Sequence, residues 1–276
     1  MKLFNKVVII GTGLIGGSLG LALKKRHLVS WITGLSRHRR NAGLAKKAGA
    51  VDYAAVSLEV VRDADLVILA TPVEAIIEIA LKIAKKIKRD CVVIDVGSTK
   101  EAIVSRLSRV IPNFIGCHPL SGSEKRGVIN LKSDIFKSSI CIITPTAKTN
   151  KKVLDKVSLL WRRLGSRVVI FSPEEHDRIL AFTSHLPHAV AFSLMGCIPD
   201  KLLSLSSAGL RDSTRISASD AKLWSEVFLS NRKNLSLCLS AFQTKLALLK
   251  LAIERKNKKL LINTLAAARK KREKLG

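Results

Sequence analysis

The stretch KVVIIGTGLIGGSLGLAL near the N-terminus restricts the fold more than any other part of the sequence. A β-branched apolar run leads directly into Gly11-x-Gly13-x-x-Gly16, and an apolar helical pattern follows. In this arrangement the first glycine permits a tight turn, the second lets the backbone approach a pyrophosphate, and the third lets the helix lie close to the strand. Because a helix N-terminus attracts negative charge, the stretch predicts a dinucleotide-binding loop that includes Leu14 and Ile15. The alternative is a tight strand-to-helix turn without a ligand.

The following 150 or so residues repeat this order of strand and helix. Short β-branched runs alternate with helical patterns, which is typical of a doubly wound parallel sheet. The early runs are continuously apolar, as strands covered on both faces are. The predicted strands cover residues 6–10, 29–35, 65–70, 91–95, 114–117, 139–144 and 166–171.

The pattern changes at FSPEEHDRILAF. Ser172 fits a helix N-cap, Pro173 fits the first helical position, and Glu175 completes a capping box. Beyond this point the pattern is helical and no strand is expected. We therefore predict an α/β protein, with an N-terminal doubly wound Rossmann domain over residues 1–172 and a C-terminal all-helical domain over residues 173–276.

Composition limits the classes of protein to be considered. The apolar fraction of 47% supports a sizeable core, and the net charge of +27 raises nucleic acid or an anionic membrane as partners. Lys and Arg are spread along the chain, however, and aromatic residues make up only 4%. A basic surface around a site for anionic small molecules is therefore favoured, and no nucleic-acid partner is expected.

Cysteine spacing and the N-terminus bear on the compartment. The cysteines are isolated and form no CxxC pair, which indicates a reducing environment without disulfides or a structural metal. MKLFNK and the apolar run after it imitate a secretory signal, but the glycines and the following KKRH argue against one. No later segment is expected to reach the length of a membrane span. We expect a soluble, cytoplasmic protein.

The residues at the end of the second strand bear on the choice of dinucleotide. NAD binders carry an acid about twenty positions beyond the glycines, for the ribose 2′-hydroxyl. This sequence has Ser36 there, followed by Arg37. A hydroxyl and a guanidinium can hold a 2′-phosphate, so NADP is expected in preference to NAD, although a solvated basic helix start is the alternative. Thr71 and Pro72 end a later strand and should lie at the edge of the sheet where cofactors bind.

The segment GCHPLSGSEKRG, residues 116–127, has two interpretations. Its small residues could cradle an anion with Lys125 as the charge, or they could give a substrate access to His118. Because the glycine loop already supplies a phosphate site, the second interpretation is favoured. His118 follows a strand on the carboxyl side of the sheet, and imidazole titrates near neutral pH. Ser98, in DVGSTK, follows another strand in the same way.

Several motifs occur together in one order. GTGLIGGSLG, DVGSTK, HPLSGSEKRGV, SPEEHD, TSHLPH and GLRDSTRIS are followed by Trp224. In this combination the chain resembles the prephenate/arogenate dehydrogenase family of tyrosine biosynthesis, from about residue 6 to about residue 235. The resemblance implies hydride transfer from a cyclohexadienol ring to a nicotinamide, with loss of carbon dioxide and aromatisation. Such chemistry needs a base for the hydroxyl proton and cations for the carboxylates.

The resemblance also implies roles for particular residues. His118 is implied to be the catalytic histidine, and Ser98 is implied to hydrogen-bond both it and the substrate. Arg215 matches the family's substrate arginine, whose guanidinium binds a carboxylate through two bonds. His185 is implied to hydrogen-bond the substrate, whereas for His188 structural packing is an equal alternative.

Three further residues are candidates for the substrate pocket. Asp212 lies three positions before Arg215 and could orient it, although a surface ion pair is the alternative. Arg211 could add a second cation. Glu124 could pair with the ammonium group that arogenate has and prephenate lacks, or it could bond Lys125 or a neighbouring chain. Lys125 is otherwise expected to be a solvated charge.

We therefore expect an NADP-preferring dehydrogenase acting on arogenate, prephenate or both. The apolar-striped helix NLSLCLSAFQTKLALLKLAIE and the resemblance indicate a homodimer. A dehydrogenase of the β-hydroxyacid type, with a catalytic lysine, would explain the glycines but not HPLSGSE together with SHLPH. A nucleic-acid-binding dinucleotide sensor is the third alternative, and it lacks a recognition motif.

Overall fold

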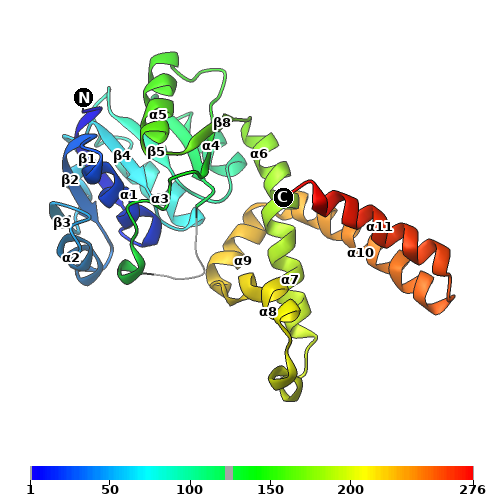
Figure 1. Ribbon diagram of the computed structural model, residues 1–276. Coiled ribbons are helices and arrows are strands. Elements are labelled where there is room, and N and C mark those ends of the chain that lie inside the picture. The colour runs from blue at the N-terminus through cyan, green and yellow to red at the C-terminus, as the bar shows by residue number, and fades with distance from the viewer. Residues whose placement is uncertain (1, 122–126, 276) are drawn as a thin grey trace. The chain divides into compact units, whose positions relative to one another are not determined.

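A computed structural model describes residues 2–121 and 127–275 (Figure 1). The described residues form one sheet with the strand order β3-β2-β1-β4-β5-β6-β7-β8. Its strands are β1 (Phe4–Ile10), β2 (Val29–Leu35), β3 (Tyr53–Ala55), β4 (Leu66–Leu69), β5 (Val92–Asp95), β6 (Phe114–Pro119), β7 (Ile140–Thr144) and β8 (Arg167–Ile170). All seven runs predicted from the sequence are strands, and β3 is an addition of only three residues.

The order of the strands reverses between β1 and β4, as in doubly wound folds, and ligands of such folds bind outside the carboxyl ends of the strands at that point. Neighbouring strands are parallel except for β6 and β7. This antiparallel pair was not expected from the sequence. It places His118 of β6 opposite Ile142 of β7, at the edge where β5 ends.

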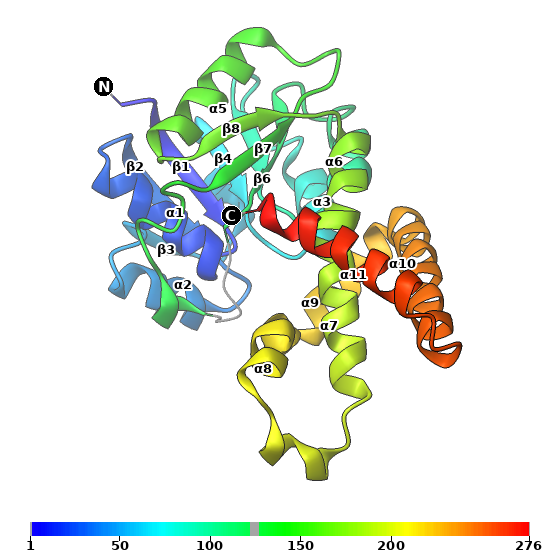
Figure 2. The ribbon, with the colours of Figure 1, turned by 45° about the vertical axis from the view of Figure 1, so that its right-hand side comes forward.

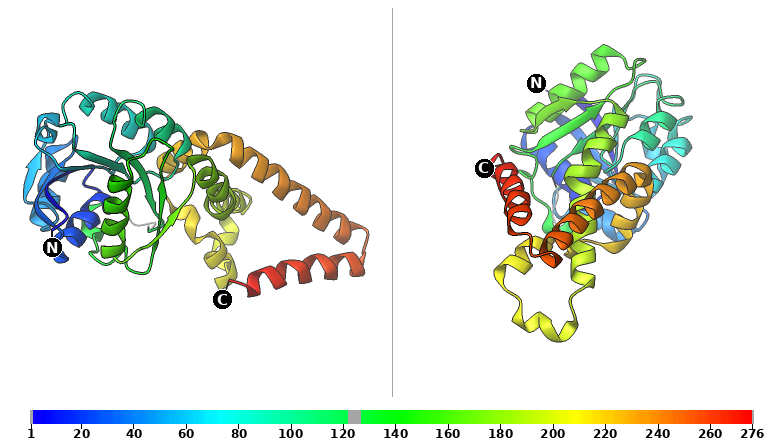
Figure 3. Two further views of the ribbon diagram at one scale, coloured as in Figure 1. Left: turned by 90° about the horizontal axis from the view of Figure 1, so that it is seen from above. Right: turned by 90° about the vertical axis from the view of Figure 1, so that its right-hand side faces the viewer.

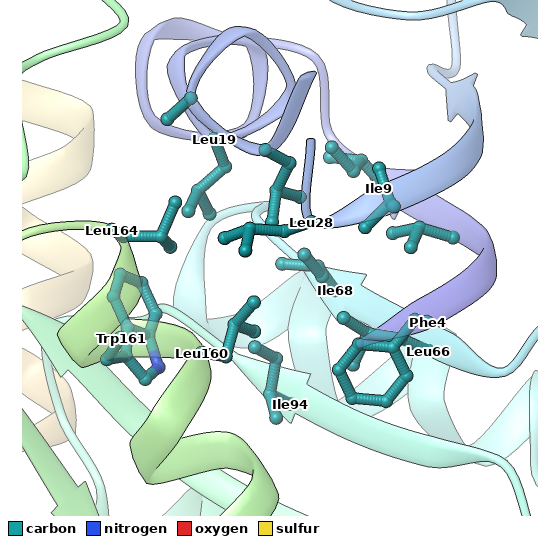
Figure 4. Close-up of a cluster of buried hydrophobic side chains, with 14 of the residues drawn as sticks. Phe4, Ile9, Leu19, Leu28, Leu66, Ile68, Ile94, Leu160, Trp161 and Leu164 are labelled. Carbon is teal, nitrogen blue, oxygen red and sulfur yellow. The ribbon is translucent and has the colours of Figure 1, made fainter. Parts of the chain in front are cut away.

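Helices cover both faces of the sheet, and each face has its own apolar core. The helices are α1 (Leu14–Lys25), α2 (Arg39–Lys47), α3 (Val73–Ile83), α4 (Glu101–Leu107) and α5 (Lys151–Arg163). On one face, Leu19 of α1 and Trp161 of α5 pack over Ile9 and Ile68 (Figure 4). On the other face, α3 and α4 pack over the alternate residues of the same strands. The doubly wound Rossmann fold predicted for the N-terminal part is confirmed.

The helical part begins with the expected capping box. Ser172 Oγ accepts a hydrogen bond from the N–H of Glu175 at 3.1 Å, and the Glu175 carboxylate accepts one from the N–H of Ser172 at 3.0 Å. The helices that follow are α6 (Pro173–Leu180), α7 (Leu186–Gly196), α8 (Ala208–Thr214) and α9 (Ala221–Ser230); α6 and α7 follow one another end to end, and α8 packs against α7 (Figure 2). No strand is described beyond β8 within residues 171–275, as the sequence predicted.

A π-helical turn, η3 (Ala181–His185), joins α6 to α7. Within it the N–H of Leu186 donates to the carbonyl of Ala181, five residues earlier. Pro187 follows and has no N–H with which to continue an α-helical ladder. Such turns occur frequently at functional sites, and this one contains His185.

The chain divides into two compact units, Met1–Asn231 and Arg232–Gly276. The second unit is a helical hairpin of α10 (Arg232–Glu254) and α11 (Lys258–Glu273), visible in Figure 3. The long apolar-striped helix predicted from the sequence is therefore present as α10. The structure changes from sheet to helix at residues 172 and 173, where the sequence predicted a domain boundary. That residues 1–172 and 173–276 are separate domains stays a prediction.

Two helical runs are long and apolar enough to cross a membrane, judged by length and composition alone. They are Pro173–Gly196 and α10. The prediction that no later segment reaches this length was therefore wrong. The first run nevertheless carries two buried polar side chains, His176 and Asp177. His176 hydrogen-bonds His118, and Asp177 accepts the backbone N–H of Lys100, so both have partners within the protein. All five cysteines are free thiols, four of them buried.

We predict that Gly20→Ala lowers the free energy of unfolding. A Cβ at Gly20 would lie closer than 3.0 Å to the carbonyl oxygen of Ala50, and neither backbone can yield easily. The expected loss is about 1–3 kcal/mol by analogy with overpacked cores, measured by urea unfolding. Gly43→Ala is the matched control, because a Cβ there meets nothing within 4 Å in helix α2, and it should stabilise by about 0.5–1 kcal/mol. Equal effects at both sites would contradict this packing.

Candidate functional site

The glycine loop has the geometry that a pyrophosphate requires. Gly11 has a φ of +97°, and a Cβ there would clash with the carbonyl of Ala70 at the end of β4. A Cβ at Gly16 would clash with the carbonyl of Gly11, so only glycine lets α1 begin this close to β1. Gly13, the N-cap of α1, has open space around it. The first N–H groups of the helix therefore face a space that an anion can occupy, flanked by Leu14 and Ile15.

Thr71 and Pro72 lie where the sequence predicted, directly after β4 and beside this loop. Thr71 Oγ1 is buried and has no hydrogen-bond partner among the described residues. Pro72 is the N-cap of α3. A buried hydroxyl without a partner is costly, so Thr71 is suited to bonding a ligand at this edge.

Ser36 and Arg37 follow β2 at the same edge of the sheet. The Ser36 N–H donates to the carbonyl of Ala55 at 3.3 Å, which fixes the turn, and the Arg37 side chain is exposed. His38 is the N-cap residue of α2, without a side-chain capping hydrogen bond, and the helix begins at Arg39. The turn thus presents a hydroxyl and cationic groups, with no carboxylate in the run SRHRR.

Three side chains form a hydrogen-bonded chain at the carboxyl end of β6. His118 Nδ1 lies 2.8 Å from His176 Nε2, and His176 Nδ1 lies 2.7 Å from Asp177 Oδ1. The Asp177 carboxylate also accepts the backbone N–H of Lys100 at 2.7 Å and that of Glu101 at 3.0 Å. Helix α6 therefore delivers a histidine and a carboxylate to the candidate base.

This arrangement determines which nitrogen of His118 is free. Both oxygens of Asp177 accept backbone N–H bonds, so its carboxylate takes the proton-bearing Nδ1 of His176 as a further donor. His176 Nε2 then carries a lone pair and accepts from His118 Nδ1–H. Among the described residues, the remaining nitrogen, His118 Nε2, is an unprotonated acceptor, and the residue keeps some exposure to solvent. It can take a proton from a ligand.

Burial keeps these imidazoles neutral. Burial lowers the pKa of His118 well below its usual value, and the charges of His176, Lys100 and His185 lower it further. Burial, with Lys100 and His185, lowers the pKa of His176 to about 2. Burial raises the pKa of Asp177 against the effect of its backbone donors. A neutral imidazole at the end of the chain is the form that a general base needs.

Ser98 lies at the same edge as His118. It follows β5, which pairs with β6 through Asp95 and Gly116, and the preceding N–H of Gly97 donates to Asp95 Oδ2 at 2.8 Å. Ser98 is partly exposed, so its hydroxyl is available to a ligand.

His185 and His188 occupy different surroundings. His185 is buried, its Nδ1 lies 3.1 Å from Asn231 Nδ2, and its Nε2 has no partner among the described residues. Asn231 also donates to the carbonyl of Asp177 at 2.7 Å, which connects His185 to the histidine chain. Burial lowers the pKa of His185 to about 4. An unpartnered Nε2 on a neutral ring can bond a ligand hydroxyl or stay as an unsatisfied core atom.

His188 is partly exposed and stacked on Trp224, with ring centroids 3.4 Å apart and planes 20° apart. Its Nδ1 lies 2.9 Å from the carbonyl of Ser184 and therefore donates to it, which leaves Nε2 as an acceptor. After burial, the charge of Arg215 is a further cause that lowers the pKa of His188, so this arginine lies near the stacked pair. The structure thus brings Arg215, His188 and Trp224 together.

Arg211 and Asp212 lie on exposed positions of α8, just before Arg215 in the short helix η5 (Arg215–Ala218). No interaction among residues 2–121 and 127–275 ties either of them to His118. Glu124 and Lys125 lie outside the described residues, so their predicted roles have no structural account. Within residues 2–121 and 127–275, no cluster of three or more His, Cys, Asp or Glu side chains is arranged to hold a metal.

His176, Asp177 and Asn231 were not predicted from the sequence as site residues. The first two lie in SPEEHD, a motif that was used for its capping box and its resemblance alone. An adjacent His-Asp pair on the first turns of a helix after a sheet is the signal that could have found them.

In comparisons with known proteins, both parts of the chain match profiles of one family. The family profile for the prephenate dehydrogenase nucleotide-binding domain matches residues 19–170, and that for the prephenate dehydrogenase dimerization domain matches residues 172–267. The solved structure of a prephenate dehydrogenase from A. aeolicus in complex with hydroxyphenyl propionate and NAD+ is similar, with a TM-score of 0.93 and 33% identity. That match covers 100% of this chain and 99% of the other.

Curated proteins with similar sequences carry names that agree with this family. The chain is 33% identical over 265 residues to a cyclohexadienyl dehydrogenase of Zymomonas mobilis, covering 92% of this chain and 90% of that protein. It is 36% identical over 239 residues to a prephenate dehydrogenase of Bacillus subtilis. The latter match covers 83% of this chain and 64% of the Bacillus protein, so the chain spans just under two thirds of that relative's length.

We predict that His185 makes the protein less stable in acid. Its folded pKa of about 4 is below the ordinary 6.5, so the unfolded chain takes up a proton first as the pH falls. The free energy of unfolding should therefore fall between these two pH values, by up to about 1.4 kcal/mol per pH unit for this one group. Urea unfolding across that window should give a shallower slope for His185→Gln than for the unsubstituted protein or for His27→Asn, an exposed control. Equal slopes would contradict the prediction.

Proposed function

We propose, since this chain belongs to the prephenate dehydrogenase family, that it catalyses the oxidative decarboxylation of prephenate, arogenate or both in tyrosine biosynthesis. The observation that carries the proposal is the chain Asp177–His176–His118, which ends in a free His118 Nε2 at the carboxyl edge of a dinucleotide-binding sheet. A base at that edge is next to where a nicotinamide lies in folds of this kind.

Residues of this chain have separate roles in the proposed reaction. His118 Nε2 accepts the proton of the substrate hydroxyl, while Asp177 through His176 keeps the ring in the required tautomer and stabilises the imidazolium that forms. Ser98 bonds the same hydroxyl and holds it toward His118. A nicotinamide cofactor held by Gly11, Gly13 and Gly16 would supply the hydride acceptor for the carbon that bears this hydroxyl. The ring carboxylate then leaves as carbon dioxide, and its bonding electrons complete the aromatic ring.

The carboxylates of the substrate need cations, and Arg215 is the proposed one. It lies near the His188–Trp224 stack, which supplies an aromatic surface and an acceptor nitrogen. A guanidinium binds a carboxylate through two parallel bonds that a lysine cannot make. His185 Nε2 is a second proposed contact, because a ligand would satisfy it. Arg211 and Asp212 are proposed to add charge and to orient Arg215.

Gly11, Gly13 and Gly16 are proposed to hold the pyrophosphate, and NADP is the proposed cofactor. The A. aeolicus relative was solved with NAD+, which describes that protein. Here Ser36 and the exposed Arg37 stand where an NAD-binding acid would be. Charge-assisted bonds from this turn to a 2′-phosphate support the choice of NADP.

A homodimer formed through α10 and α11 is also proposed. These two helices expose Leu237, Leu246, Ile253, Ile262 and Leu265 by more than half of each side chain. Such a set of exposed apolar residues is typical of an interaction surface, and the matching family profile is named for dimerization. The free thiols favour the cytoplasm as the place where it works.

The direct test of the proposed function is an assay of four mixtures. Purified protein is given prephenate or arogenate, each with NAD or NADP, and reduced cofactor is followed by absorbance. Turnover of at least one substrate, faster with NADP, is the expected result. No turnover in any mixture would refute the proposal.

We predict that His118→Asn lowers kcat by roughly 10²–10⁴-fold, the usual contribution of a general base. Asparagine cannot take up the proton, but it leaves the glycine loop intact, so cofactor affinity measured by fluorescence should change little. His27→Asn is the matched control, because His27 is exposed and its φ of +52° is one that asparagine tolerates. Full activity in His118→Asn would remove His118 from the mechanism.

We predict that Arg37→Ala lowers kcat/KM with NADP by about tenfold or more and leaves kcat/KM with NAD nearly unchanged, because only NADP has the 2′-phosphate. Ser36→Asp should add the missing acid and shift the preference toward NAD. Arg109→Ala, at an exposed position after α4, serves as a charge-matched control. If Arg37→Ala lowered kcat/KM equally with NADP and NAD, Arg37 would not bind the 2′-phosphate.

A further inference from the structure

Lys100 is completely buried, although lysine is among the residues least often found in a protein interior. Its ammonium group forms an ion pair with Asp95, whose side chain is also fully buried, and donates to the carbonyl of Thr99 at 3.1 Å. Removing two charges from water costs several kcal/mol per ion, which their mutual attraction only partly offsets. Stability alone therefore gives a weak reason for this pair.

The ion pair lies beside both candidate reacting groups. Besides Lys100, Asp95 Oδ2 accepts the N–H of Gly97 at 2.8 Å, and Gly97 directly precedes Ser98. Asp95 also lies opposite Gly116 of β6, two residues before His118, and the Cys117 backbone lowers the pKa of Asp95. One buried carboxylate thus fixes the loop that carries the serine and lies against the strand that carries the histidine.

The same lysine also holds the far end of the histidine chain. Its backbone N–H donates to Asp177 Oδ1 at 2.7 Å, the oxygen that accepts from His176 Nδ1. The stem of the Lys100 side chain runs beside Gly116, where an added Cβ would lie 3.1 Å from Lys100 Cδ. Lys100 therefore contacts Asp95 at one end of this arrangement and Asp177 at the other without reaching solvent.

We propose that Lys100 is a positioning residue for His118. Its buried ammonium group holds the geometry around His118 through Asp95, and its positive charge keeps the His118 ring neutral. This inference rests on the proposed role of His118 as the base, and it adds what keeps that base competent.

The charge of Lys100 acts on the base directly. It lowers the pKa of His118 and of His176, in addition to the larger effect of burial. Among the described residues, the other titratable groups around His118 are Asp95 from β5, His176 and Asp177 from α6, His185 from η3, and Cys117 and Cys141 from β6 and β7. Lys100 is the cation of this set, so its loss should make His118 easier to protonate.

The test compares the unsubstituted protein with Lys100→Met, which removes the charge and keeps most of the volume. The titration of the His118 ring is followed by NMR, and its signal is identified by its loss in His118→Asn. We expect the midpoint to rise by about one pH unit or more in Lys100→Met, a tenfold or larger gain in proton affinity. The acidic limb of the kcat/KM profile should move with it. Lys151→Met, at an exposed position on α5, should leave both unchanged.

Two further variants cover the case in which an unpaired Asp95 prevents folding. The double variant Asp95→Asn with Lys100→Met removes both charges and should raise the midpoint in the same direction. Lys100→Arg keeps the charge and should hold the midpoint near that of the unsubstituted protein. A uniform loss of kcat at every pH with an unchanged midpoint would overturn the proposal and leave Lys100 a purely structural residue. Failure of both neutral variants to fold would overturn it too.

The NMR measurement needs no turnover, so it separates this inference from the proposed reaction. An inactive protein whose His118 midpoint still depends on Lys100 would refute the reaction alone. An active protein whose midpoint is indifferent to Lys100 would refute the inference alone.

Discussion

The hydrogen-bonded chain of Asp177, His176 and His118 is the interaction on which the site depends. It connects the first helix after the sheet to the end of β6, and so it joins the helical part to the nucleotide-binding part within the unit Met1–Asn231. The capping box at Ser172 starts α6 at the residue that brings His176 and Asp177 against the sheet. Local helix-start chemistry thereby determines where the partners of His118, the proposed base, lie.

The edge of the sheet that carries this chain is built differently from its interior. The strands bury apolar side chains on both faces, whereas their carboxyl ends bury Asp95, Lys100, His176, Asp177 and His185. Unsatisfied or unpaired groups of this kind destabilise a fold, and here nearly all of them are bonded to one another. Among the described residues, Thr71 Oγ1, Asp95 Oδ1 and Thr99 Oγ1 near this edge, and His185 Nε2 in η3, have no hydrogen-bond partner, and a ligand could satisfy those that it reaches. The polar network is best understood as support for chemistry that the apolar core cannot perform.

Local sequence patterns predicted most of the strands and helices of this protein. They did not predict contacts between residues far apart in the sequence. The glycine spacing, the seven apolar runs and the capping box of Ser172 and Glu175 are set by neighbouring residues, and the structure has all of them. The antiparallel pairing of β6 with β7 and the π-helical turn at His185 depend on tertiary packing. His176 was not predicted because its partner His118 lies 58 residues away along the chain. Lys100 was not predicted because the sequence does not show that it is buried, although its partner Asp95 lies only five residues away. Periodicity carries no information on such pairings.

The central claim is that Asp177, through His176, presents His118 to its ligand as a neutral ring with an unprotonated Nε2. The most direct test is ¹⁵N NMR of the ring nitrogens of His118 and His176 at neutral pH, which distinguishes protonated from unprotonated nitrogens. We expect a protonated Nδ1 and an unprotonated Nε2 in both rings. A proton on His118 Nε2, or a doubly protonated His118, would contradict it.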